Sequence, residues 1–348
     1  MPMKLLTIVF LCATLMLTAS ISWAQPNTAG SAAVPIRRTL EQSQKPEQPA
    51  ATDQKKEGKD FLWKVASDKG QAYILGTLHM VPKNFPPIPA EIEQAFQSSN
   101  YLVVELDDSK ADPYQMQQVT KQKGMYPPED GLSKHISSLT KEVLDSYLSK
   151  AGITTSVFDV FKPWLAGLTI SVAELQRQGF DTQAGLDKHF IREAKASNKE
   201  VLELESIDFQ INLLSGFSDD LQDKLLLQSL LEIKDAKTEA QKMIDAWCNG
   251  NSEKMLEVVT KDLAEHPELK PVLEKLVDER NISMEKKIEE YLARGGTYFV
   301  AVGAGHLVGE KGIIHLLQDK GYKVEQVTKS SIPASVSGIQ PVFVGNSI

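Results

Sequence analysis

Cysteine is nearly absent from this chain of 348 residues, which contains only Cys12 and Cys248. Cys12 lies in an N-terminal segment with the pattern of a signal peptide, so cleavage would leave Cys248 alone. One cysteine cannot form an internal disulfide, and the fold must therefore be held together by its core. Cys248 follows Trp247 near the expected end of a helix, where a small buried side chain is a better interpretation than a nucleophile.

Hydrophobic runs long enough for a confident membrane span are lacking as well. The apolar run of residues 5–17 is too short for one, and Lys4 is the only charge before it. Ser22-Trp23-Ala24 then supplies the small-x-small pattern that precedes a cleavage site. Residues 1–24 are therefore predicted to be a signal peptide, and the mature protein to be periplasmic or secreted and not membrane-spanning. An uncleaved anchor is the alternative.

Net positive charge is also missing, because the acidic residues outnumber the basic ones and the formal net charge is −8. Such a chain has no electrostatic footprint for nucleic acid, and no nucleic-acid partner is expected. Residues 25–60 are rich in Pro, Gln, Ala, Lys and Glu and are predicted to be a disordered linker. Residues 330–348, rich in Ser, Pro and Gly, are predicted to be a flexible tail. Residues 61–329 remain as one folded domain.

The domain carries predicted strands at its two ends and helices in its middle. Residues 61–65 and 71–75 flank the turn-forming cluster Asp68-Lys69-Gly70 and predict a β-hairpin. Further strands are expected at 101–105, 201–204, 298–302 and 323–327, and helices at 89–96, 184–196, 253–264, 271–293 and 311–319. A long helical insert is predicted by an apolar stripe that Gly250 ends: Leu226, Leu230, Ile233, Ala240, Ile244 and Trp247. The fold class is α/β (α+β mixed), with a central β-sheet.

Two of the predicted strands, far apart in the chain, end in the same pattern. One continues into Gly76-Thr77-Leu78-His79 and the other into Gly303-Ala304-Gly305-His306. A glycine at the end of a strand lets the backbone turn sharply or approach a ligand closely. The histidine then lies at the carboxyl end of the strand, where open α/β sheets place their sites. Each histidine alone could be a capping or core residue, but the matched pair predicts one shared site.

Glu105 is the third candidate, because it follows the apolar strand residues Leu102-Val103-Val104. A carboxylate at the end of a buried strand is costly to desolvate unless it is paired, protonated or bound to a cation. With His79 and His306 it would form a set suited to a divalent transition metal such as zinc, manganese, iron or cobalt. Glu105 could be a ligand or the general base, and the residues alone leave that choice open.

Motifs of other hydrolase and nucleotide-binding classes are missing. The chain has no G-x-S-x-G nucleophile elbow, no phosphate-binding loop and no H-E-x-x-H zinc helix. Arg280 lies in a predicted helix and could hold a substrate carboxylate or an oxyanion, or else make an inter-helix ion pair. Asp187 and Glu205 could fix a ligating imidazole, or serve as ordinary helix caps and ion-pair partners.

Taken in order along the chain, these segments resemble the TraB/PrgY/GumN family over about residues 61–327. The matching features include both Gly-x-x-His segments and Val103-Val104-Glu105-Leu106-Asp107. The others are Lys162-Pro163-Trp164, Gly185-Leu186-Asp187, Glu203-Leu204-Glu205, Trp247 with Gly250, Arg280-Asn281 with Met284, and Gly321-Tyr322.

The resemblance implies membership of a superfamily with the Tiki metalloproteases, which favour manganese or cobalt. It assigns His79, His306 and Glu105 to the metal site, and it also implies a fold like that of erythromycin-esterase-like (EreA) and haem-binding ChaN-like proteins. The leading hypothesis is an exported, metal-dependent hydrolase that acts on a peptide or protein substrate at an amide bond. In it, Glu105 is ligand or base and Arg280 steadies the substrate or the developing charge.

Two other functions stay open. One is a non-catalytic envelope protein that binds a ligand at the same sheet edge, and the other is a metal-free, esterase-like hydrolase with a histidine base. The helical insert could also form a homodimer surface, although packing within the chain explains its stripe equally well.

Overall fold

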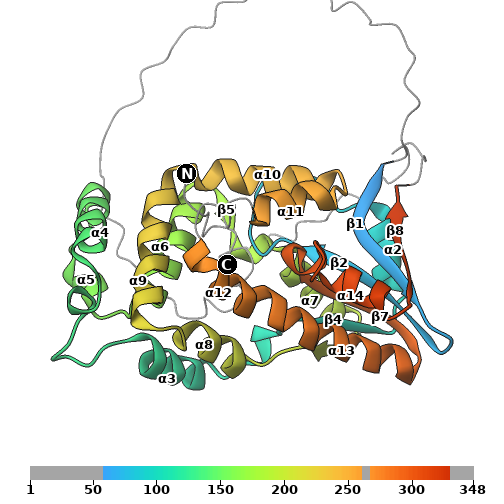
Figure 1. The fold of residues 1–348 in the computed structure, drawn as a ribbon. Coiled ribbons are helices and arrows are strands. Elements are labelled where there is room, and N and C mark those ends of the chain that lie inside the picture. The colour runs from blue at the N-terminus through green and yellow to red at the C-terminus, as the bar shows by residue number, and fades with distance from the viewer. Residues whose placement is uncertain (1–57, 261–266, 330–348) are drawn as a thin grey trace, which may run out of the picture.

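The computed structural model describes residues 58–260 and 267–329 as a mixed α/β fold around a six-stranded sheet (Figure 1). The strand order is β6-β4-β7-β2-β1-β8. The predicted signal peptide, nearly all of the predicted linker, the predicted tail and the end of the helix expected at 253–264 lie outside the described residues. The expectation of a central sheet with a helical insert is confirmed.

The antiparallel half of the sheet is the predicted hairpin with one further strand. β1 (Lys59–Ala66) and β2 (Gly70–Thr77) pair with Leu62 opposite Leu75, and β8 (Lys323–Thr328) pairs with the other edge of β1. β1 begins at Lys59, inside the predicted linker of residues 25–60, because Lys59 pairs with Thr328 of the last strand.

The parallel half of the sheet brings three strand ends together. β7 (Gly296–Gly303) lies between β2 and β4 (Tyr101–Val104) and is parallel to both, and β6 (Glu200–Glu203) extends the sheet beyond β4. Thr77 is in register with Gly303, and Val104 with Ala301. The carboxyl ends of β2, β4 and β7 therefore lie next to one another, as a shared site requires.

Consecutive side chains of β7 point to opposite faces of the sheet, and helices cover the apolar side chains on both faces. Phe299 points to one face and packs against Phe96 of α2 (Ala90–Ser98) and Phe190 of α7 (Leu186–Ala196). Tyr298 points to the other face and stacks on Tyr291 of α13 (Glu279–Arg294), which also packs against α14 (Ile313–Asp319). The rings of Tyr298 and Phe299 are both buried, so the hydrophobic core lies on both faces of the sheet.

The remaining helices form two inserts rather than one. The first, between β4 and β5 (Phe180–Asp181), contains α3 (Pro113–Gly124), α4 (Ser138–Ala151), α5 (Ser156–Asp159) and α6 (Pro163–Arg177). The second, between β6 and β7, contains α8 (Ile207–Ser215), α9 (Asp219–Glu232), α10 (Ala236–Cys248), α11 (Ser252–Thr260), α12 (Lys270–Leu273) and α13.

The two inserts pack on each other through α9, which contacts both α4 and α6. A short 3₁₀ turn at Ile233–Asp235 divides the predicted apolar stripe between α9 and α10. β3 (Val81–Pro82) pairs with β5 in a separate two-stranded sheet. Within residues 58–260 and 267–329, none of the helices combines the length and apolarity that crossing a membrane needs.

Candidate active site

The three residues predicted for the site surround one glycine at the end of the central parallel strand. A Cβ built on Gly303 would lie 3.2 Å from Glu105 Oε1, 3.3 Å from His79 Nε2 and 3.5 Å from His306 Cδ2. All three side chains are at most 3 % exposed. The strand register thus brings His79, Glu105 and His306 into a single buried cradle above Gly303.

His79 is held from behind by the start of helix α7. Gly185 approaches so closely that a Cβ there would lie 2.4 Å from the His79 carbonyl oxygen, and the Leu186 N–H donates to the Leu78 carbonyl at 3.0 Å. This places Asp187 Oδ1 3.3 Å from His79 Nδ1. Burial opposes protonation of His79, but the Asp187 carboxylate outweighs it and raises the pKa of the imidazole. Neither ring nitrogen of His79 forms a well-aligned hydrogen bond among the described residues, and Nε2 faces the cradle.

His306 is oriented by Asn281 of α13. The Asn281 side chain donates through Nδ2 to the Lys311 carbonyl at 2.8 Å, so its Oδ1 is an acceptor. His306 Nδ1 lies 2.6 Å from that oxygen and must therefore carry the proton, which leaves the lone pair on Nε2. Burial, together with the charge of Arg280, lowers the pKa of His306 well below its ordinary value. The ring is neutral, and its Nε2 is 3.9 Å from Glu105 Oε1 without a hydrogen bond of its own in the described structure.

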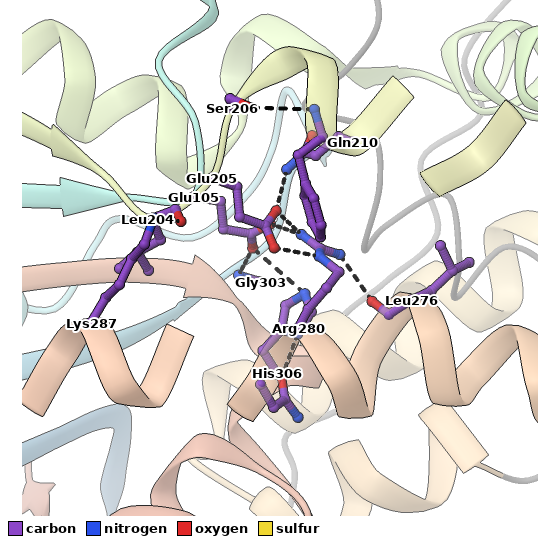
Figure 2. A network of polar contacts seen from close by, with 12 residues as sticks. Glu105, Leu204, Glu205, Ser206, Gln210, Leu276, Arg280, Lys287, Gly303 and His306 are labelled. Atoms are coloured by element: carbon purple, nitrogen blue, oxygen red, sulfur yellow. Dashed lines mark hydrogen bonds and ion pairs between the residues drawn. The ribbon is translucent and has the colours of Figure 1, made fainter. Parts of the chain in front are cut away.

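Glu105 is fixed by donors on both of its oxygens (Figure 2). The Gly303 N–H donates to Oε1 at 2.6 Å, and Arg280 Nη2 donates to Oε2 at 2.6 Å. Arg280 also forms a bidentate pair with Glu205, through Nε and Nη2 at 2.8 Å each, and its Nη1 donates to the Leu276 carbonyl. The guanidinium is 2 % exposed and bridges two carboxylates.

The structure identifies the interaction partners of Arg280 and Glu205, which the sequence left open. Arg280 was expected to steady substrate, and the structure shows its guanidinium orienting Glu105, so contact with substrate would require it to exchange partners. Glu205 was considered as a partner of a ligating imidazole. It pairs with Arg280 instead, whereas Asp187 does contact an imidazole, that of His79.

The donor set suits a divalent transition metal in kind, because two buried imidazoles and a carboxylate converge on a common cradle. His306 presents the lone pair of its Nε2, whereas the raised pKa of His79 means that a metal would have to displace a proton from that ring. Within the described ranges, no group of three or more His, Cys, Asp or Glu side chains is already arranged as a metal site. Both oxygens of Glu105 already accept hydrogen bonds, from Gly303 and from Arg280. A cation held by His79 and His306 would require a neutral His79, and Glu105 would have to share an oxygen or act as the base.

Sequence reasoning missed the part that Asn281 plays, although the residue had been noted beside Arg280. Asn281 lies far from His306 in the chain, and only the packing of α13 against the turn after β7 brings them together. The sequence offered one signal, which is that two polar residues, Arg280 and Asn281, are consecutive in a predicted helix. The structure shows that both are buried in α13.

The chain is similar in sequence to a protein family and to several known proteins. The family model described as TraB/PrgY/gumN family matches residues 61–326. An uncharacterised protein, YbaP of Escherichia coli K12, is 25% identical over 250 residues, which cover 71% of this chain and 87% of that protein. The metalloprotease TIKI2 of Danio rerio is 22% identical over 322 residues, with 78% and 61% covered. A metalloprotease TIKI homolog of Amphimedon queenslandica is 41% identical over 59 residues, 16% of this chain and 12% of the other. No solved structure matches.

Proposed function

The chain belongs to the TraB/PrgY/gumN family, and we propose that it is an exported, metal-dependent hydrolase that cleaves a peptide amide bond. The observation that carries this proposal is the cradle above Gly303, where His79, Glu105 and His306 converge from three neighbouring parallel strands. The names of the Danio and Amphimedon relatives, both metalloproteases, support the choice of a peptide substrate. Export rests on the N-terminal sequence pattern.

In this proposal each residue has a part that its contacts support. His79 and His306 would hold the cation through Nε2, and the carboxamide of Asn281 and the carboxylate of Asp187 fix the orientation of the two rings. A bound divalent cation would supply an acidified water and polarise the scissile carbonyl. Glu105, oriented by the Gly303 N–H and by Arg280, is the group available to take a proton at Oε1.

The first experiment is the metal content of the protein purified without chelators, compared with His79→Ala and His306→Ala. His315→Ala is the matched control, because His315 is half-exposed on α14 and remote from the cradle in its contacts. We expect about one transition metal per chain in the wild type and the control and almost none in either cradle variant. Loss of metal from only one cradle variant, or from neither, would contradict a shared site.

Hydrolysis of a peptide library, read by mass spectrometry, tests the reaction itself. We expect chelator to abolish cleavage and manganese or cobalt to restore it. Glu105→Gln should keep the fold and lose cleavage, by roughly 10²-fold or more if Glu105 is the base. The amide has one acceptor oxygen for the two donors that Glu105 satisfies, so a thermal melt must accompany this variant. Full activity in Glu105→Gln would overturn its assignment.

A metal-free hydrolase is the second candidate, and one observation favours it specifically. Both oxygens of Glu105 are already hydrogen-bonded, while neutral His306 presents an unpartnered Nε2 that could accept a proton. Cleavage that persists in chelator would select this candidate. The third candidate, an envelope ligand-binding protein, is selected if the wild type retains a ligand and no peptide is cleaved.

A further inference from the structure

A cavity of about 490 Å³ opens beside the carboxyl ends of β4 and β6, and the chemistry proposed above leaves it without a role. Its walls come from three segments: the turn after β4, helix α3, and the segment from the end of β6 to the start of α8. Glu205 lies in its wall and also binds Arg280, which in turn binds Glu105. One guanidinium therefore separates this cavity from the cradle.

The cavity is acidic beyond what its neighbours neutralise. Its lining includes five carboxylates and a single lysine: Asp107, Asp112, Glu203, Glu205, Asp208 and Lys110. Lys110 Nζ lies 3.6 Å from Glu203 and 3.9 Å from Asp107, and Lys195 Nζ lies 3.6 Å from the other oxygen of Asp107. Asp107 is 1 % exposed, and its Oδ2 has no hydrogen-bond partner in the described residues. This oxygen is too far from Lys110 Nζ for a hydrogen bond, so the negative charge of Asp107 is only partly compensated in the cavity wall.

Two of the carboxylates are also exposed at the starts of helices. Asp112 caps α3 by accepting from the Tyr114 N–H at 2.9 Å, and Asp208 lies in the first turn of α8. Neither forms an ion pair within the ranges that the structure describes. Tyr114, beside them in the cavity lining, is 68 % exposed. An aromatic face next to carboxylates suits a cation with an aliphatic stem.

We propose that this cavity is the subsite that binds a lysine or arginine side chain of the peptide substrate. The inference rests on the proposed peptidase function, and it adds the substrate class. An anionic or purely apolar side chain would leave the Asp112 and Asp208 carboxylates without a counter-charge. A cationic side chain seated against Glu205 would contact the residue that joins this cavity to the cradle, because Glu205 binds Arg280 and Arg280 binds Glu105.

Binding can be measured separately from cleavage, by calorimetry with blocked alanine pentapeptides that carry lysine, norleucine or glutamate at the centre. Norleucine keeps most of the aliphatic stem of lysine and removes its charge. We expect the lysine peptide to bind at least about 5-fold more tightly than the norleucine peptide, and the glutamate peptide least tightly. The preference should shrink when salt is raised from about 50 mM to about 500 mM. Equal binding of all three peptides, or no binding of any up to about 1 mM, would overturn the subsite.

Variants that neutralise individual carboxylates test which residues cause the preference for the lysine peptide. Asp112→Asn with Asp208→Asn removes two charges at the mouth of the cavity, and asparagine preserves the helix cap that Asp112 provides. We expect this double variant to lose about 3-fold or more of the lysine preference. The control is Glu253→Gln with Glu257→Gln, which removes the same charge from exposed positions of α11. If the control loses the preference equally, the net charge of the protein causes it and the subsite is wrong.

The two proposals fail separately in this design. Lysine-selective binding that depends on Asp112 and Asp208, without cleavage of any peptide, would keep the subsite and reject the peptidase. Cleavage that is indifferent to lysine, with equal binding of the three peptides, would keep the peptidase and reject the subsite.

Discussion

The two glycines of the Gly-x-x-His pair are needed for different reasons. A Cβ on Gly76 would lie 2.5 Å from Phe61 Cδ1 and 3.0 Å from the Ala304 Cα, so this glycine is a packing residue between β2 and its neighbours. A Cβ on Gly303 would instead point at the Glu105 carboxylate and the two imidazoles, at 3.2 to 3.5 Å. The same sequence pattern therefore provides packing against an aromatic ring at one strand end and close approach to the polar side chains of the cradle at the other.

Alanine at each glycine tests that difference. Gly76→Ala should lower the free energy of unfolding by about 1–3 kcal/mol through overpacking. Gly303→Ala should change it by no more than about 1 kcal/mol, because Gly303 has φ −52° and ψ 135°, which alanine adopts readily. Gly303→Ala should nevertheless lose metal and hydrolysis. Urea unfolding and metal analysis of both variants are the measurements, and full metal content in Gly303→Ala would show that no ligand occupies the cradle.

The site residues that sequence could predict are those that end strands. His79, Glu105 and His306 each follow an apolar β-run, so the convergence of parallel strand ends was sufficient to group them. The exact partners of Arg280, Glu205 and Asn281 could not be found in this way. They are set by the rotation of α13 relative to the sheet, which depends on the packing of many side chains and leaves no local pattern in the sequence.

At the scale of elements, helix α10 is joined to the first Gly-x-x-His segment by one buried hydrogen bond. Trp247 Nε1 donates to the Gly76 carbonyl at 2.6 Å, and the indole also packs against Phe85. Gly250 then ends the helix with φ +59°, and a Cβ there would lie 2.2 Å from the Lys59 carbonyl oxygen. The second insert is therefore fastened to the strand that leads to His79.

Trp247→Phe should remove this hydrogen bond and leave the Gly76 carbonyl short of a buried donor. We expect the free energy of unfolding to fall by about 1–3 kcal/mol, together with weaker metal binding because Gly76 precedes His79 closely. Trp164→Phe is the control, since its Nε1 donates to the Lys123 carbonyl at a longer 3.3 Å in a partly accessible place. Equal losses in the two variants would contradict a special link between α10 and β2.

The elements themselves were predictable to different degrees, for physical reasons. The hairpin β1–β2 and the strands β4 and β7 were predicted because apolar runs and turn residues are local signals. The stripe from Leu226 to Trp247 was correctly read as helical, but its division at Ile233–Asp235 was not, because the chain turns there without Gly or Pro. Helices α3 to α6 were not individually predicted, and they turn the expected single insert into two that pack together.

For the whole molecule, one buried carboxyl at the start of the sheet should shape the dependence of stability on pH. Asp60 is 1 % exposed, and neither of its carboxyl oxygens has a hydrogen-bond partner in the described structure. Burial, aided by the nearby charge of Glu91, raises the pKa of Asp60 from 3.8 to about 6, although Lys329 opposes the shift. Folding therefore favours the protonated carboxyl, whose stabilising effect is present below pH 3.8 and is lost as the pH rises through about 6.

Asp60→Asn should consequently stabilise the protein at neutral pH and not in acid, because the amide stays neutral throughout. We expect a gain of about 1–2 kcal/mol near pH 7 and none near pH 4, measured as the free energy of unfolding in urea at the two pH values. Asp68→Asn, at an exposed turn of the same hairpin, is the control for a general effect of removing one negative charge from an acidic protein. A gain that is equal at both pH values, or equal in the control, would mean that the burial of Asp60 is not its cause. A gain confined to neutral pH in Asp60→Asn alone would assign the effect to the buried carboxyl of Asp60.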